Sequence, residues 1–167
     1  PKFKSKHVGT HHVGFPQNTK IDFEAGKVSL PKLGWVKTKI SREFYGNIKT
    51  STIEKTPTNK FFISITVELP DVKVKQKPIS KKNAVGIDTG IKTFATLSDG
   101  TEIENPKHLK NNLQRLKVLQ KRASKKQKGS VNRKKANLQV ARLHERIANQ
   151  RLDFLHKTTT AIAKQYD

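Results

Sequence analysis

The sequence predicts an α+β fold, with short antiparallel strands first and helices in the last third. Residues 60–69 alternate apolar and polar side chains, which is typical of a strand with one buried face. Residues 84–106 contain three short apolar runs separated by turn residues at Gly90 and at Asp99-Gly100, the pattern of an antiparallel meander. After Pro106, leucines recur at steps of three and four residues, which predicts helix.

Several more short strands are expected before residue 70. His11 and His12 belong to a strand rather than a helix, because Gly9, Gly14 and Pro16 disfavour helical geometry. Further candidate strands cover residues 21–24, 27–30, 35–40 and 47–54. Antiparallel strands of this length without long helices predict a small barrel-like domain or sandwich over residues 1–72.

The second half is expected to be a separate domain, residues 84–167, joined to the first by a basic linker at residues 73–83. A first helix should open at Pro106 and end near Gly129, and a second should start at Ser130. The two should form an antiparallel hairpin. The predicted contact seam of the second helix consists of Ala141, Ala148, Leu152, Leu155, Thr159, Ile162 and Tyr166.

The charge of the chain indicates a polyanionic partner. Thirty-five Lys and Arg against 13 Asp and Glu give a formal charge of +22, which opposes compaction by self-repulsion. No long apolar run or strongly apolar amphipathic face indicates a membrane, so nucleic acid is the favoured partner. The chain has no cysteine, which excludes disulfides and a cysteine zinc site, so zinc is not expected.

Candidate nucleic-acid contacts fall in both halves of the chain. In the predicted hairpin they are Lys117, Lys121, Arg122, Lys125, Lys126, Lys128, Arg133, Lys134, Lys135 and Arg142, a run without acidic residues. In the β region they are Lys37, Lys39 and Lys49, interleaved with Trp35, Phe44, Tyr45 and Phe62. Such aromatic side chains either stack on unpaired bases or fill the core, and the sequence leaves both roles open.

Asp88 is the candidate catalytic and metal-binding residue. It ends an almost wholly apolar run, where a carboxylate is costly to bury unless it is paired or holds a cation. One interpretation is a ligand for a divalent cation, with Gly86 and Gly90 allowing close approach. The other is a turn aspartate that accepts hydrogen bonds from the amides that follow.

Around Asp88 the sequence resembles the TnpB (OrfB-like) family of transposon-encoded, RNA-guided DNA endonucleases. The resemblance covers residues 85–92 and 94–100, Asn105-Pro106-Lys107, and a signature formed by Asn149, Arg151, Asp153, Phe154, His156 and Lys157. It implies a ribonuclease H-like (RuvC) sheet in which Asp88 is the first of three acidic magnesium ligands. It also implies that residues 1–72 correspond to the wedge domain, and that guide RNA and target DNA are the partners.

The resemblance also implies that the chain is a piece of a longer, cytoplasmic prokaryotic protein that associates with the nucleoid when bound to DNA. The other acidic residues of the family lie beyond Asp167, so the chain is expected to bind nucleic acid without cutting it, and its first RuvC strand to be open to edge-strand self-association. Two alternatives remain. One is a non-enzymatic basic RNA- or DNA-binding protein in which Asp88 is structural. The other is a nucleotide binder of the actin and sugar-kinase type, which opens with a similar Gly-Ile-Asp-x-Gly strand.

Overall fold

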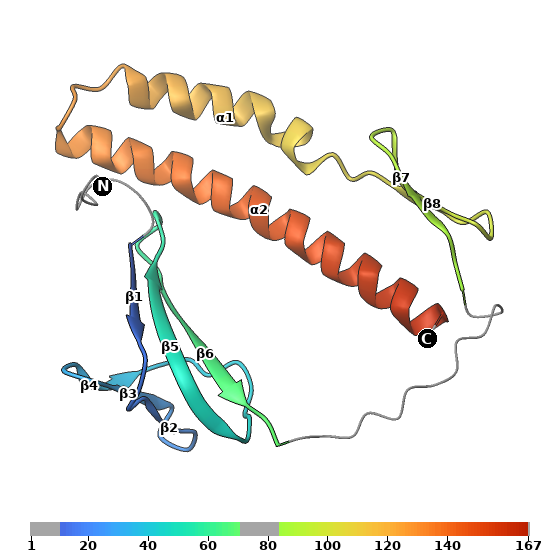
Figure 1. Cartoon of the computed structure of the whole chain (residues 1–167). Helices are drawn as coiled ribbons and strands as arrows, with labels where there is room; N and C mark the ends of the chain where they lie inside the picture. The colour runs from blue at the N-terminus through green and yellow to red at the C-terminus, as the bar shows by residue number, and fades with distance from the viewer. Residues whose placement is uncertain (1–10, 71–83, 167) are drawn as a thin grey trace, which may run out of the picture. The chain divides into compact units, whose positions relative to one another are not determined.

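The computed structural model describes residues 11–70 and 84–166 and divides the chain into two compact units, residues 1–75 and 76–167 (Figure 1). The predicted linker, residues 73–83, lies wholly outside the described residues and stays a prediction. Within the described part, three three-stranded antiparallel sheets and two helices confirm the α+β class.

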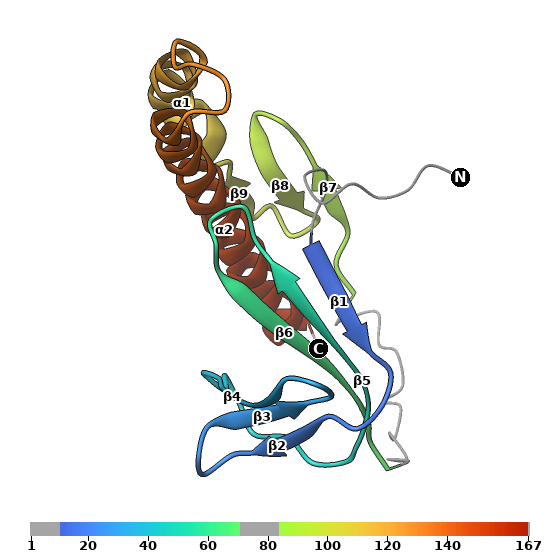
Figure 2. The same ribbon diagram turned by 90° about the vertical axis from the view of Figure 1, so that its left-hand side faces the viewer.

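The larger sheet of the first unit has the order β1-β5-β6 (Figure 2). Its strands are β1 (His11–Phe15), β5 (Asn47–Lys55) and β6 (Phe61–Glu68). The alternation of β6 places Ile63, Ile65 and Val67 on one half-buried face, as the sequence predicted. Entry into β5 requires Gly46, because its φ is 113° and an added Cβ would lie 2.4 Å from the carbonyl oxygen of Glu68.

The smaller sheet of the first unit has the order β2-β3-β4. It contains β2 (Lys20–Asp22), β3 (Lys27–Leu30) and β4 (Gly34–Lys37). Val28 and Leu30 are buried on its inner face. A hollow of about 530 Å³ is lined by Ile21 and Val28 from this sheet and by apolar β6 residues from the other, so the apolar faces of the two sheets turn toward each other.

The barrel-like form of the first unit was wrong for the described residues. A barrel requires a sheet that closes on itself, whereas each of these two sheets has an unpaired strand at both ends of its order. The strands of the smaller sheet pair only with one another, so this sheet does not join the larger one into a closed cylinder. The arrangement is the sandwich alternative, built from two small sheets.

The meander of the second unit is confirmed. It consists of β7 (Ile87–Thr89), β8 (Thr93–Leu97) and β9 (Glu102–Glu104) in the order β7-β8-β9, so β7 is an edge strand within the described part of the chain. The register of β8 against β9 shifts between Thr93 and Ala95. This irregularity allows Phe94 to face α2 together with buried Ala95 and Leu97.

Two antiparallel helices complete the second unit: α1 (His108–Ser124) and α2 (Val131–Tyr166), which lie side by side in both views (Figures 1 and 2). Their shared core contains Leu116, Leu143 and Ile147. The predicted hairpin is confirmed, although α1 ends at Ser124, before the glycine expected to cap it.

The predicted seam of α2 was wrong over its central part. Leu152 is 53% exposed and Leu155 38% exposed, whereas Leu143 and Ile147, which the seam omitted, are buried. Helix α2 carries two neighbouring apolar stripes, and α1 covers the one that includes Val140, Leu143 and Ile147. Periodicity alone cannot tell which stripe a partner covers.

Candidate nucleic-acid interface and carboxylate site

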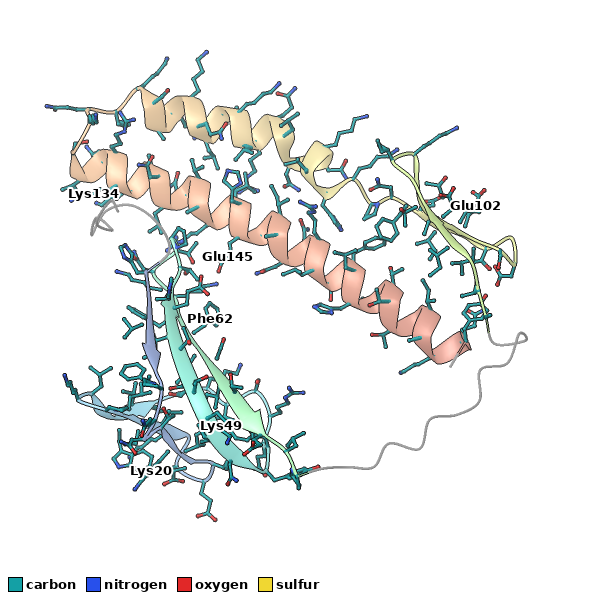
Figure 3. All side chains as sticks on the ribbon, viewed as in Figure 1. Lys20, Lys49, Phe62, Glu102, Lys134 and Glu145 are labelled. Carbon is teal, nitrogen blue, oxygen red and sulfur yellow. The ribbon has the colours of Figure 1, made fainter. Side chains whose placement is uncertain are left out.

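The exposed cations of the hairpin form its most distinctive surface. The predicted contacts on α1, in the turn and on α2 are all exposed except Arg133, which is half-buried. From residue 107 to residue 151, Glu145 is the only acidic residue, and there is no Phe, Tyr or Trp. Figure 3 shows Lys134 near the start of α2, beside the hairpin turn, and Glu145 further along the helix. Apart from that one carboxylate, the surface offers only positive charge to a partner.

The hairpin turn gathers these cations around a hollow of about 540 Å³ lined by Arg122, Lys125, Lys126 and Lys135, among others. The turn is held rigidly. The backbone N–H of Arg133 donates to Ser130 Oγ at 3.1 Å, which caps the start of α2, and Arg133 Nη1 donates to the carbonyl oxygen of Lys126 at 3.0 Å. Arg133 therefore positions the turn, a structural role that the sequence did not indicate.

The three predicted lysine contacts of the β unit differ in availability. Lys37 on β4 and Lys39 after it are exposed. The Nζ atom of Lys49 lies 2.7 Å from Glu68 Oε2, and both side chains are 54% exposed. Such an exposed ion pair contributes little stability. The nearby Glu68 carboxylate nevertheless makes Lys49 a weaker candidate for a phosphate contact.

The aromatic residues of the β unit divide between core and surface. Phe44 packs edge-on against Phe23, with ring centroids 5.3 Å apart. Trp35, Tyr45 and Phe62 are 55%, 67% and 54% exposed. A fourth exposed ring, Phe61, was not among the predicted contacts; the Nζ atom of Lys55 lies 5.7 Å from its centroid.

Asp88 lies at the middle of the edge strand β7 and is exposed. It pairs across the sheet with Thr96, which pairs with Glu102, so the three side chains share one face. Figure 3 shows Glu102 on this sheet. In the described residues the Asp88 carboxylate has no hydrogen-bond partner, which does not favour the turn interpretation. Nor do those residues contain a group of three His, Cys, Asp or Glu side chains that could hold a metal ion.

The Asn105-Pro106-Lys107 motif joins the meander to α1. Asn105 Nδ2 donates to the carbonyl oxygen of Ile91 at 2.9 Å, and Asn105 Oδ1 accepts from the backbone N–H of Lys107 at 3.0 Å. One side chain thus fixes the β7–β8 turn against the start of α1. The sequence identified the motif but not this bridging function.

The signature on α2 is mainly structural. Phe154 packs against Phe94 with centroids 4.9 Å apart at an interplanar angle of 81°, which docks the meander onto α2. Lys157 donates to Asp153 Oδ2 at 2.7 Å, the predicted i to i+4 pair. His156 is exposed, and within the described residues its ring takes part in no polar network.

A second attachment between meander and helix was not predicted. The Tyr166 hydroxyl donates to Asp99 in the β8–β9 turn. This hydrogen bond, followed by those from Thr101, lowers the pKa of Asp99 below its ordinary value. The same bond raises the pKa of Tyr166. The two groups are far apart in sequence, so no local pattern could have paired them.

Comparisons of the sequence with known proteins identify relatives of this chain. The OrfB_IS605 family model, described as a probable transposase, matches residues 64–167. The chain is 39% identical over 166 residues to the "Putative RNA-guided DNA endonuclease InsQ" of Escherichia coli strain K12, covering 99% of this chain and 40% of that protein.

A second relative, a "Putative RNA-guided DNA endonuclease" of Streptomyces pristinaespiralis, is 42% identical over 116 residues, which is 70% of this chain and 28% of that protein. The chain thus spans well under half the length of these relatives. Among the described residues, no helix is both long and apolar enough to span a bilayer. Since the family model covers most of the sequence, including the meander and both helices, the chain belongs to the OrfB_IS605 family of transposases.

Proposed function

We propose that this chain is part of a transposon-associated RNA-guided DNA endonuclease, in which it binds guide RNA and target DNA. The observation that carries the proposal is the hairpin, held at its turn by hydrogen bonds, whose cationic surface holds a single acidic residue over residues 107–151. Phosphate contacts supply most of the sequence-independent affinity for nucleic acid, and they need cations without competing carboxylates. The names of the two relatives agree with both partners.

The meander supplies one part of the proposed cleavage site. Asp88 is exposed on a short strand, where its carboxylate is accessible to a cation. Two-metal phosphodiester cleavage needs several carboxylates around cations about 4 Å apart. The described residues do not provide that set. Asp88 is therefore proposed as one ligand of a magnesium site completed by other segments of the full-length protein, and no cleavage step is assigned to this chain alone.

Neither alternative explains the same observations as well. A nucleotide binder of the actin and sugar-kinase type would account for the first strand, but the family model matches the meander together with both helices. A non-enzymatic binder would account for the hairpin and for Asp88, whose carboxylate is exposed and needs no partner, but the two relatives are named as endonucleases.

The test is Asp88→Asn in the full-length protein, assayed for guide-RNA binding, target binding and Mg²⁺-dependent cleavage. We expect cleavage to fall at least about a thousandfold, since a metal ligand is lost, while both binding affinities stay within about twofold. The matched control is Asp153→Asn, which removes an exposed aspartate from α2 and should leave cleavage intact.

Cleavage retained by the Asp88→Asn protein would contradict the role of Asp88. A wild-type protein that binds RNA and DNA but cuts neither would favour the non-enzymatic alternative.

A further inference from the structure

We propose that Trp35, on the outer face of the β2–β3–β4 sheet, is a stacking platform for an unpaired base of a bound nucleic acid. The inference rests on the proposed nucleic-acid binding. It assigns to one surface the recognition of single-stranded rather than duplex segments. It starts from an exposed large aromatic residue whose neighbours on the sheet are lysines.

The strand register defines this face. Trp35 pairs with Ser29, which pairs with Lys20, and this row crosses all three strands. Directly opposed residues of an antiparallel sheet share a face, and residues two apart along a strand share it too. A second row on the same face therefore contains Asp22, Lys27 and Lys37. Figure 3 shows Lys20 on this sheet.

The opposite face already forms the core, so Trp35 is not needed there. Ile21, Val28 and Val36 make up its central row, in which Val28 is only 1% exposed, Ile21 is half-buried and Val36, on the edge strand β4, is 42% exposed. Trp35 is 55% exposed and, within the described residues, contacts no other aromatic ring and no cation. A large apolar ring left open in this way is a candidate contact surface rather than a packing element.

The charges around the ring suit a polynucleotide. Lys20, Lys27 and Lys37 are all exposed. The one carboxylate of the face, Asp22, accepts a 2.8 Å hydrogen bond from the backbone N–H of Ala25, which ties it to the β2–β3 turn. Lys37 lies two residues from Trp35, about 7 Å along the strand, and Lys20 two strands away, about 10 Å. Cations at these separations can reach the phosphates on either side of a base stacked on the indole.

The two other exposed aromatic residues on a strand, Phe61 and Phe62 of β6, are less suitable. The Nζ atom of Lys55 lies 5.7 Å from the Phe61 ring centroid, so a cation already lies over that ring. Phe62, which Figure 3 shows on β6, pairs with Glu54, which pairs with His12. Glu54 is exposed and would repel a phosphate near that ring. Trp35 thus differs from both in combining an open ring with exposed lysines on the same face.

An unpaired base is the ligand that this arrangement fits. A ring can stack on an indole only when its π face is open, and bases inside a duplex already stack on their neighbours. Lysines alone would bind duplex and single strand through the same phosphates. Trp35 should therefore favour single-stranded segments, with little dependence on base identity.

The experiment uses the intrinsic fluorescence of Trp35, the single tryptophan of the chain, as a reporter at the proposed site. The 167-residue protein is titrated with a single-stranded oligouridine or oligothymidine and with a duplex of equal length, at the same ionic strength, while anisotropy of a labelled strand measures binding. We expect the single strand to quench the fluorescence and the duplex to leave it nearly unchanged. Trp35→Leu should weaken single-strand binding about 5- to 100-fold and Trp35→Phe much less.

The matched control is Leu33→Ala, which shortens another exposed apolar side chain next to β4 and should change neither signal. Any of three results would overturn the inference without contradicting the proposed function. They are single-strand binding without quenching, equal quenching by the duplex, and unchanged affinity of Trp35→Leu. If neither nucleic acid binds the wild-type protein, the proposed nucleic-acid binding itself is wrong. Because quenching is measured on the wild-type protein, the test holds even if a variant fails to fold.

Discussion

The two units of the molecule are both basic, but they present their positive charge differently. The β unit displays Trp35, Tyr45, Phe61 and Phe62 on its surface, whereas the helical hairpin has no Phe, Tyr or Trp over residues 107–151. Charge alone is sufficient to hold phosphates, while recognition of open bases needs aromatic rings. We therefore expect the hairpin to bind the nucleic-acid backbone and the β unit to bind unpaired nucleotides.

Neutralising the hairpin turn should give the largest effect. We expect the triple variant Lys125→Gln, Lys126→Gln and Lys135→Gln to reduce the slope of log affinity against log salt by about 2 to 3, since each lost phosphate contact removes about 0.7 to 0.9. All three side chains line the hollow at the turn. The measurement is a salt titration of binding from 50 to 200 mM, and quenching of Trp35 at saturation should persist.

A matched variant removes three exposed lysines of the same unit away from the turn: Lys92, Lys157 and Lys164, each replaced by Gln. This variant has the same net charge as the triple variant at the turn. The two together therefore distinguish phosphate contacts made at the turn from a general effect of lower net charge. Equal salt slopes for the two triple variants would show that the lysines at the hairpin turn have no special role in binding.

The packing of the hairpin can be tested with two leucines of α2. Leu143 is 5% exposed and lies in the α1–α2 core, while Leu152 is 53% exposed. Leu143→Ala should lower the free energy of unfolding of the second unit by about 2 to 5 kcal/mol, and Leu152→Ala by less than about 1 kcal/mol. Denaturant titrations followed by helical circular dichroism measure this unit, and Trp35 fluorescence follows the β unit separately. Equal losses would mean that the helices pack through the other stripe.

These leucines also show which features of the fold the sequence could not predict. The bounds of β3, the meander and the hairpin follow from local alternation, turn residues and caps, all of which lie close in sequence. The choice between two apolar stripes on α2 depends on which one α1 reaches, and the open sandwich depends on which strands of the first unit pair, which no turn signal fixes. Local patterns do not contain either piece of information.

The candidate site shows the same limit. Asp88 and the hairpin lysines stand out by charge in an unusual context, so the sequence alone predicts them as candidate site residues. The Asn105 bridge, the Phe94–Phe154 contact and the positioning role of Arg133 depend on residues that the fold brings together. The sequence singled out Asn105, Phe154 and Arg133, but nothing in it marks these particular contacts.

The open edge of β7 provides a smaller test, on amide exchange. The backbone N–H of Gly90 donates to the carbonyl oxygen of Phe94, and that of Ser98 donates to the carbonyl oxygen of Gly86. Alternation of the ladder then points the amides of Ile87 and Thr89 away from β8. In dilute protein these two amides should exchange faster than that of Asp88, with a difference of at least about tenfold.

Raising the protein concentration tests the expected self-association. If β7 edges pair between molecules, the amides of Ile87 and Thr89 should become protected. Strong protection of both at high dilution would mean instead that another segment of the chain covers this edge.

The smallest effect concerns pH and again distinguishes the units, because the Asp99–Tyr166 hydrogen bond acts in the second unit alone. The pKa of Asp99 is lowered in the folded state, so its stabilisation is present above the ordinary value of 3.8 and is lost as the pH falls through the folded value. The pKa of Tyr166 is raised, so its contribution is present below 10.0 and is lost as the pH rises through the folded value. The Asp99 carboxylate is exposed and Tyr166 is only half-buried, so the change is small. Tyr166→Phe should lower the urea midpoint of the helical signal slightly near neutral pH, and the difference from wild type should shrink as the pH falls below 3.8 or rises above 10.0, while the Trp35 signal is unaffected. A difference that stays constant across this range would show that Tyr166 stabilises the end of α2 through its ring contacts rather than through this hydrogen bond.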